Sequence, residues 1–174
     1  MARLIVKSPY IKGGGKGGYA KYIATRDGVE LLPSGYMEYM ARRPHSHGLF
    51  GDADRVDLGK AIQEVNQYPG NIWTHIISLK REDAERLGYD LAPQWRNLLQ
   101  AHRNDIATAM HIPPQDFRWY AAFHDEGKHP HVHMMAWSTQ PGEAYLTRDG
   151  IRNIKSTLTN QIFKQEMLHT YEQK

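Results

Sequence analysis

The chain has 174 residues, a length that suits one domain with a buried core. It has no cysteine, which excludes disulfides and thiolate metal sites, and its net charge of +3 is compatible with nucleic acid without being diagnostic of it. Because we find neither a signal peptide nor an apolar run near the roughly 20 residues of a membrane span, we expect a cytoplasmic protein with no membrane span.

The chain opens with a short strand and a glycine-rich segment. Residues 2–7 are predicted to be a buried strand. Residues 12–18 hold five glycines together with Lys12 and Lys16, which is typical of a surface loop whose bare backbone can approach phosphate groups. The segment lacks the GxxxxGK[ST] spacing of a P-loop, so we expect no nucleotide cofactor.

Two tyrosines follow in a predicted short helix over residues 19–26. Tyr19, Tyr22 and Ile23 lie on one side of that helix because they are spaced by three and four residues. On composition alone, packing of both phenols against the sheet is the favoured interpretation. The alternative is that one phenol points into a functional site.

Residues 31–55 give mixed signals and are predicted to be mainly loop. Arg42 and Arg43 form a small basic patch there, a pattern that is most often a solvated face. His45 and His47 stand among proline, serine and glycine, so we interpret them as loop residues, with a DNA contact as the alternative.

Regular elements are predicted for most of the remaining chain. The expected elements are helices over 57–68, 81–87 and 92–110, a central strand over 72–79, and a final helix from Thr147 to about Glu172. Asp57 is the candidate N-cap of the first of these helices, and Thr147 is the expected cap of the last. His75 lies in the central strand, where a core or edge histidine is favoured over a fourth polar group near a metal. This element order predicts an α+β domain with a mainly antiparallel sheet and helices packed on it.

The segment 117–138 is predicted to be two strands joined by a turn around residues 125–128. Strand side chains alternate between the two faces, so His131 and His133 share a face. A hairpin brings His124 back beside them, and three imidazoles then converge on one patch of the sheet.

Three neutral imidazoles form a half-shell that can hold a divalent cation and leave positions open for substrate. Asp125 and His129 are nearby alternative ligands, but His129 adjoins Pro130 and has the wrong parity relative to the turn. We expect manganese or magnesium, with zinc, nickel or cobalt as alternatives.

Three short motifs resemble those of HUH endonucleases. His131-Val132-His133 resembles motif III, two histidines around a bulky hydrophobic residue, and His124-Asp125-Glu126 is similar to the opening of that motif in P-class conjugative relaxases. Lys21-Tyr22-Ile23 resembles the Tyr-Ile pair that carries the nucleophile in these enzymes. The likeness is to MobL-like relaxases of mobilisable plasmids and integrative elements of Gram-positive bacteria.

The resemblance implies the HUH fold and a division of roles among these residues. His124, His131 and His133 would hold the metal over the scissile phosphate. Tyr22 would attack that phosphate, with Tyr19 as the second candidate, and form a 5′-phosphotyrosine. Glu126 would accept a hydrogen bond from a ligand histidine.

The resemblance also implies DNA as the partner. The expected substrate is single-stranded DNA at an origin of transfer, oriT, with relaxosome accessory proteins and a coupling protein as further partners. The expected DNA-binding residues are Lys12, Lys16, Lys21, Arg26, Arg42 and Arg43. Residues 1–174 are predicted to be a single nicking domain, with a catalytic fragment of a longer protein as an extension of that prediction.

Two alternatives stay open. One is an enzyme with the same chemistry but another biological role, a rolling-circle replication initiator or a transposase of the HUH superfamily. The order of the motifs, with the tyrosine before the histidine pair, favours a relaxase. The other is a DNA-binding module without catalysis, whose histidines hold a structural metal. A structural site would need four protein ligands, and the sequence offers three well-placed ones.

Overall fold

The computed structural model describes residues 4–11, 46–125, 127–164 and 166. Its strands are β1 (Leu4–Lys7), β2 (Tyr10–Ile11), β3 (Ser46–Gly51), β4 (Ile72–Leu79), β5 (Phe117–His124) and β6 (His131–Ser138). Its helices are α3 (Leu58–Gln67), α4 (Arg81–Leu87), α5 (Ala92–Ala101), α6 (Arg103–Ala109) and α7 (Arg148–Ile162), with a short 3-10 turn over Pro114–Asp116.

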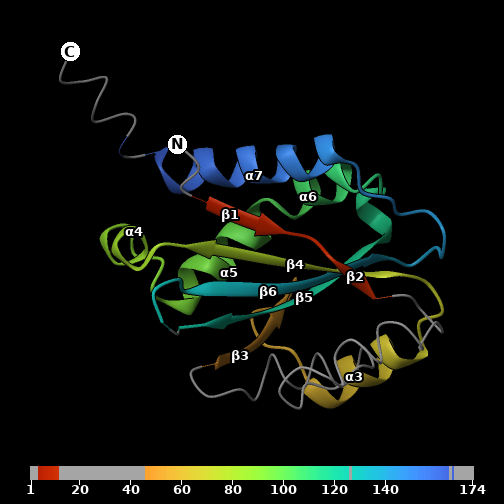
Figure 1. Cartoon of the computed structure of the whole chain (residues 1–174). Coiled ribbons are helices and arrows are strands. Elements are labelled where there is room, and N and C mark those ends of the chain that lie inside the picture. The colour runs from red at the N-terminus through yellow and green to blue at the C-terminus, as the bar shows by residue number, and fades with distance from the viewer. Residues whose placement is uncertain (1–3, 12–45, 126, 165, 167–174) are drawn as a thin grey trace, which may run out of the picture.

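The strands form one six-stranded sheet in the order β1-β4-β6-β5-β3, and β2 also pairs with β4. All of the pairings are antiparallel. β6 lies between β4 and β5 and is paired along both of its edges (Figure 1). The α+β class with a mainly antiparallel sheet, predicted from the element order, is therefore confirmed.

Helices cover the two faces of the sheet unequally. The helices α5, α6 and α7 lie on one face, and α3 lies on the other (Figure 1). The larger apolar cluster includes Trp95, Phe123 and Val132 and belongs to the first face. A smaller cluster joins Val65 of α3 to Trp137 of β6 on the second face. Alternation of side chains along β5 and β6 sends every second residue to each cluster.

Helix caps predicted from the sequence are present. The Asp57 carboxylate accepts a hydrogen bond from the Lys60 amide at 3.0 Å at the start of α3. The Thr147 hydroxyl accepts one from the Gly150 amide at 3.0 Å at the start of α7. Gly150 also allows α7 to approach α6 closely, because a Cβ at this position would lie 2.4 Å from the Ala109 carbonyl oxygen.

The predicted single helix over 92–110 is wrong, because the structure has two helices, α5 and α6. They meet at His102, where ψ is 14° instead of the helical value near −42°. The His102 ring contacts the Asp105 carboxylate at 2.9 Å, and Arg103 donates to the Phe117 carbonyl oxygen at 2.8 Å. The apolar stripe continues through this bend, so hydrophobic periodicity alone gave no sign of it.

The loop interpretation of His47 is also wrong, because His47 lies in β3. The register of β3 against β5 shifts between Ser46 and Leu49, and Gly48 adopts a left-handed φ of +89° within that irregularity. A bulge of this kind interrupts the alternation by which a strand is recognised in a sequence. The two-residue β2 was likewise too short to give a pattern.

The final helix begins where predicted, after its Thr147 cap. α7 ends at Ile162, and residues 167–174, which the predicted helix partly covers, lie outside the described residues. Its buried residues include Ile154, Leu158 and Ile162, which pack in the larger apolar cluster. α7 is therefore on the face of the sheet opposite α3 (Figure 1).

Candidate metal centre

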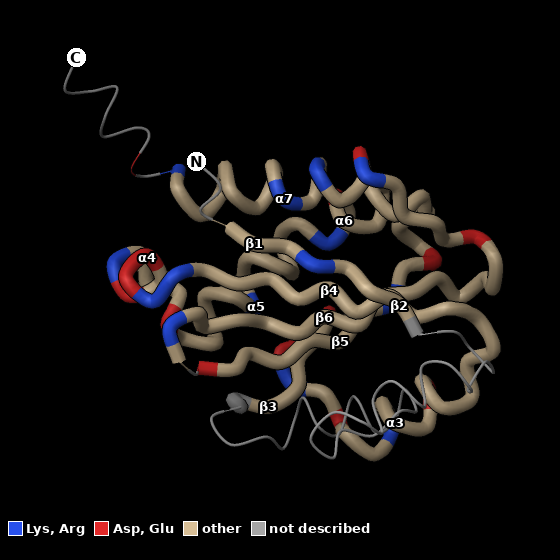
Figure 2. Tube along the Cα trace, viewed as in Figure 1, with Lys and Arg blue, Asp and Glu red and all other residues tan. Residues whose placement is uncertain are grey.

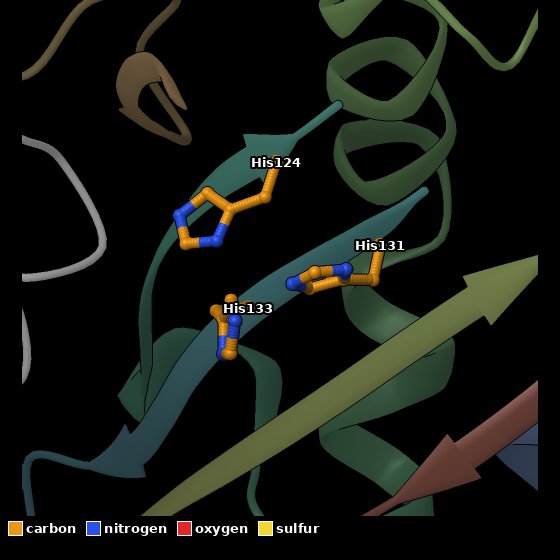
Figure 3. A group of neighbouring side chains, drawn as sticks. All are labelled: His124, His131 and His133. Carbon is orange, nitrogen blue, oxygen red and sulfur yellow. The ribbon is translucent and has the colours of Figure 1, made fainter. Parts of the chain in front are cut away.

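Three histidines from the hairpin of β5 and β6 lie together. His124 pairs directly with His131 across the two strands, and His133 pairs with Ala122, one cross-strand row further along. All three imidazoles come from the same face of the sheet and point toward one another (Figure 3). The predicted convergence of the three rings is present, because a short hairpin and strand alternation together leave no other arrangement.

The three rings form a tight, mostly buried group. Their centroids are 5.2 Å apart for His124 and His131, 4.6 Å for His124 and His133, and 4.9 Å for His131 and His133. His124 is 0% exposed and His133 is 7% exposed, whereas His131 is half-buried. The group therefore reaches the surface on the side of His131.

A backbone carbonyl defines the tautomer of His131. Nδ1 of this ring lies 3.1 Å from the carbonyl oxygen of His129. A carbonyl can only accept, so Nδ1 donates this hydrogen bond, and in the neutral ring Nε2 is then the nitrogen that can bind a metal. A ligand histidine is commonly oriented in this way, with its second nitrogen donating to a carbonyl group. The position of His129 before the strand gave no sign of this role, which belongs to its main chain.

The group has the donor set and spacing of a metal site. Each ring offers one nitrogen, and these three atoms all lie within 4.8 Å of one another. Nitrogens bound to one tetrahedral ion lie about 3.4 Å apart when each bond is about 2.1 Å long. Small rotations of the imidazoles therefore bring the set to bonding distance, and the residues fit a divalent cation.

Among the described residues, no carboxylate or further histidine joins the three rings to complete a closed shell. Asp125, an alternative ligand in the sequence, instead contacts Arg81, with Nη1 and Oδ1 separated by 2.5 Å. A structural metal site usually has four protein ligands, whereas a catalytic one keeps positions open. The described group is thus of the open kind.

The sheet continues beside the rings on the same face. Ser78 and Ile76 of β4 pair with His131 and His133, and Lys7 of β1 pairs in turn with Ile76. The side chain of Lys7 is exposed. The helix α3 covers the far end of this face, around Met135 and Trp137, rather than the histidines. A partly apolar strip of sheet with a cation at its edge therefore adjoins the three rings.

His75 lies on the opposite face and takes no part in the group. It is 0% exposed, and its Nδ1 and Nε2 atoms lie 2.8 Å from Ser8 Oγ and 3.2 Å from Met110 Sδ. Burial lowers the pKa of His75 to about 4, so the ring is neutral at pH 7. The interpretation of His75 as a core histidine is confirmed.

The other predicted site residues lie outside the described residues. They are the two candidate nucleophiles Tyr19 and Tyr22, Glu126, and the DNA-binding set Lys12, Lys16, Lys21, Arg26, Arg42 and Arg43. Their roles stay predictions, and so do the roles of the three histidines as ligands.

The fold and this group define an α+β protein whose antiparallel sheet carries an open, three-histidine candidate metal centre. The family model of the MobL relaxases matches residues 34–174, and the chain belongs to that family. The matched range includes all three histidines and begins after Tyr22. Comparisons with curated proteins and with solved structures gave no match.

Membership of a relaxase family implies an enzyme that binds and nicks DNA. None of the helices in the described part of the chain combines the length and the apolar character needed to cross a bilayer.

Proposed function

We propose that this relaxase nicks one DNA strand at an origin of transfer and later rejoins it, during mobilisation of a conjugative plasmid or an integrative element. The observation that carries the proposal is the group of three histidines, which is mostly buried and reaches the surface at His131. This group lies within the residues that match the relaxase family.

His124, His131 and His133 would hold a divalent cation, manganese or magnesium first, with zinc, nickel or cobalt as alternatives. When bound, such a cation polarises a non-bridging oxygen of the scissile phosphate and offsets the charge of the transition state. The hydrogen bond from His131 Nδ1 to the His129 carbonyl leaves Nε2 as the nitrogen of the neutral ring that would bind the cation. Burial of His124 excludes water from one side of the group.

Tyr22 is the proposed nucleophile, on its resemblance to the relaxase Tyr-Ile pair, and Tyr19 is the second candidate. The phenolic oxygen forms a bond to phosphorus while the bond from phosphorus to the 3′ oxygen breaks. The products are a 5′-phosphotyrosine and a 3′-hydroxyl, which takes up a proton. A free phenol has a pKa of about 10, so a nearby base has to accept its proton. Because the new ester conserves the energy of the old one, the reverse reaction rejoins the strand.

Residues around the site are proposed to serve this chemistry. Glu126 would accept a hydrogen bond from a ligand histidine and so orient its ring. The basic residues of the segment 12–43 would contact DNA phosphates. Relaxosome accessory proteins and a coupling protein are the proposed partners, and the proposed compartment is the cytoplasm.

The proposal is tested by trapping the covalent intermediate. The purified protein is incubated with Mn²⁺ and a labelled single-stranded oriT oligonucleotide, and the mixture is run on a denaturing gel. We expect a protein-DNA adduct that disappears when EDTA is added or when His133 is replaced by alanine. Binding of the oligonucleotide without any adduct or nicked product would instead favour a DNA-binding module without catalysis. Nicking without an adduct would exclude the tyrosine mechanism.

A further inference from the structure

Arg81 joins the end of β4 to the turn of the hairpin that carries the histidines. It is the first residue of α4, which is separated from the end of β4 by Lys80 alone. Figure 2 shows α4, with its mixed positive and negative charges, at the end of the sheet where β5 and β6 meet. The Arg81 main-chain amide donates to the Lys128 carbonyl oxygen at 2.7 Å, so the backbone of α4 is already attached to this turn.

The Arg81 side chain contacts the turn at two further points. Nη1 donates to the Asp125 carboxylate at 2.5 Å. Nε and Nη2 both donate to the Gly127 carbonyl oxygen, at 3.1 Å and 2.9 Å. Gly127 adopts a left-handed φ of +63°, which a residue with a side chain rarely adopts, so its carbonyl has a direction specific to this turn.

These contacts hold the loop between the histidines at its first residue, Asp125, and at its middle, Gly127 and Lys128. Asp125 directly follows His124. Gly127 and Lys128 directly precede His129, whose carbonyl oxygen accepts the Nδ1 proton of His131. A guanidinium group presents its donors in a rigid plane, so this one side chain fixes the Asp125 carboxylate relative to the Gly127 carbonyl.

We propose that Arg81 is a positioning residue for the three-histidine centre. It holds the turn that follows His124 and precedes His129, whose carbonyl contacts His131, and it keeps the Asp125 carboxylate out of the ligand set. This inference rests on the proposed metal-binding function of the centre. The Arg81 and Asp125 side chains are 28% and 35% exposed, so solvent screens their ion pair and it adds little to overall stability. Its effect is therefore on local geometry.

The test measures Co²⁺ affinity through the visible absorption of the bound ion. Arg81→Ala should weaken Co²⁺ binding about tenfold, because loss of a contact that orients metal ligands commonly has an effect of this size. The substitution should also change the absorption spectrum. Arg86→Ala is the matched control. Arg86 lies on the same helix and also forms ion pairs, with Asp83 at 2.8 Å and Glu166 at 2.9 Å, but it forms none with the described residues of the turn. It should bind Co²⁺ as the unchanged protein does.

Two further variants separate the contacts and remain informative if Arg81→Ala does not fold. Asp125→Asn leaves Arg81 bound to the Gly127 carbonyl and should lower Co²⁺ affinity less than Arg81→Ala. Arg81→Lys keeps the charge without the planar donors and should recover only part of the affinity. A loss in Asp125→Asn as large as that in His133→Ala would show that Asp125 is itself a ligand and would overturn the proposal.

The failures are distinguishable. If the unchanged protein does not bind Co²⁺, the metal centre and the role of Arg81 both fail. If it binds and Arg81→Ala binds equally well, or if Arg86→Ala loses as much, only the role of Arg81 fails. A readout without metal completes the test: amide exchange over residues 125–130 should be faster in metal-free Arg81→Ala than in Arg86→Ala. Equal exchange in the two variants would also count against the proposal.

Discussion

His124 on β5 and His131 on β6 are direct cross-strand partners, and their ring centroids are 5.2 Å apart. Two candidate ligands on adjacent strands are held at a fixed separation by the hydrogen bonds of the sheet. The third ring, on His133, follows two residues along the same strand.

Removal of one imidazole should abolish metal binding without unfolding the protein. His131→Ala and His133→Ala each remove a proposed ligand from a sheet face rather than from the apolar core. Co²⁺ or Mn²⁺ titration, nicking assays and thermal unfolding are the measurements. Loss of binding and nicking is expected, with little change in melting temperature.

The matched control for this experiment is His129→Ala. His129 contributes its backbone carbonyl to His131, and alanine retains that carbonyl. We therefore expect near-normal metal affinity in this variant. Full nicking and unchanged metal content in His131→Ala or His133→Ala would refute the assignment of the ligands.

The nucleophile is predicted to be Tyr22. Tyr22→Phe removes only the attacking oxygen, so the variant should bind oriT DNA normally and form no covalent adduct. Tyr19→Phe should retain substantial cleavage. Peptide mapping of the trapped adduct identifies the modified residue directly.

An adduct on Tyr19 would move the role of nucleophile by three residues and leave the mechanism unchanged. Cleavage by a protein that carries both substitutions would show that neither phenol attacks the phosphate.

Binding of single-stranded DNA should weaken steeply as salt rises. Each phosphate neutralised by a lysine or arginine contributes a slope of about −0.7 to the plot of log affinity against log salt. Alanine substitution of Arg42 together with Arg43 should reduce the magnitude of the slope, measured by fluorescence anisotropy across a salt series. An affinity that does not respond to salt would argue against the basic segment as the binding surface. The final helix, a further candidate for phosphate contacts, packs on the face of the sheet opposite α3 and the histidines.

Stability should fall on acidification because of His75. Its folded pKa of about 4 lies below its ordinary value of 6.5, so between these values the unfolded chain binds the additional proton. Linkage then makes the free energy of unfolding decrease as pH falls through this window, by about 2 kcal/mol between pH 7 and pH 5.

Urea unfolding at pH 7 and at pH 5 measures this contribution. In His75→Gln, which cannot titrate, the decrease between the two pH values should be smaller by about the same 2 kcal/mol. An unchanged pH dependence in the variant would mean that His75 is not the group responsible.

The sequence was sufficient to predict the hairpin and its histidines because both depend on local rules. Alternation and a short turn determine which faces His124, His131 and His133 occupy. The helix caps at Asp57 and Thr147 also follow from residue type and spacing, and both are present.

Features that depend on tertiary contacts were not predictable in this way. The bend at His102 coincides with contacts that Arg103 makes to distant segments, including the Phe117 carbonyl oxygen. The bulge in β3 interrupts the alternation of buried and exposed side chains, so the sequence around His47 resembled a loop. The hydrogen bonds of Arg81 to the hairpin turn join positions more than forty residues apart, and no local pattern marks them.

The central position of β6 in the sheet restricts where insertions can occur near His131 and His133. A slip of one residue along this strand would move both of its histidines to the opposite face and bring Val132 and Met134 out of the core. Because β6 is bonded to β4 and β5 on its two edges, such a slip would break both ladders at once. Burial of the apolar residues on one face therefore fixes the register of β6 and with it the positions of the imidazoles on the other face. We expect single-residue insertions to be tolerated only in the loops beyond the ends of β6.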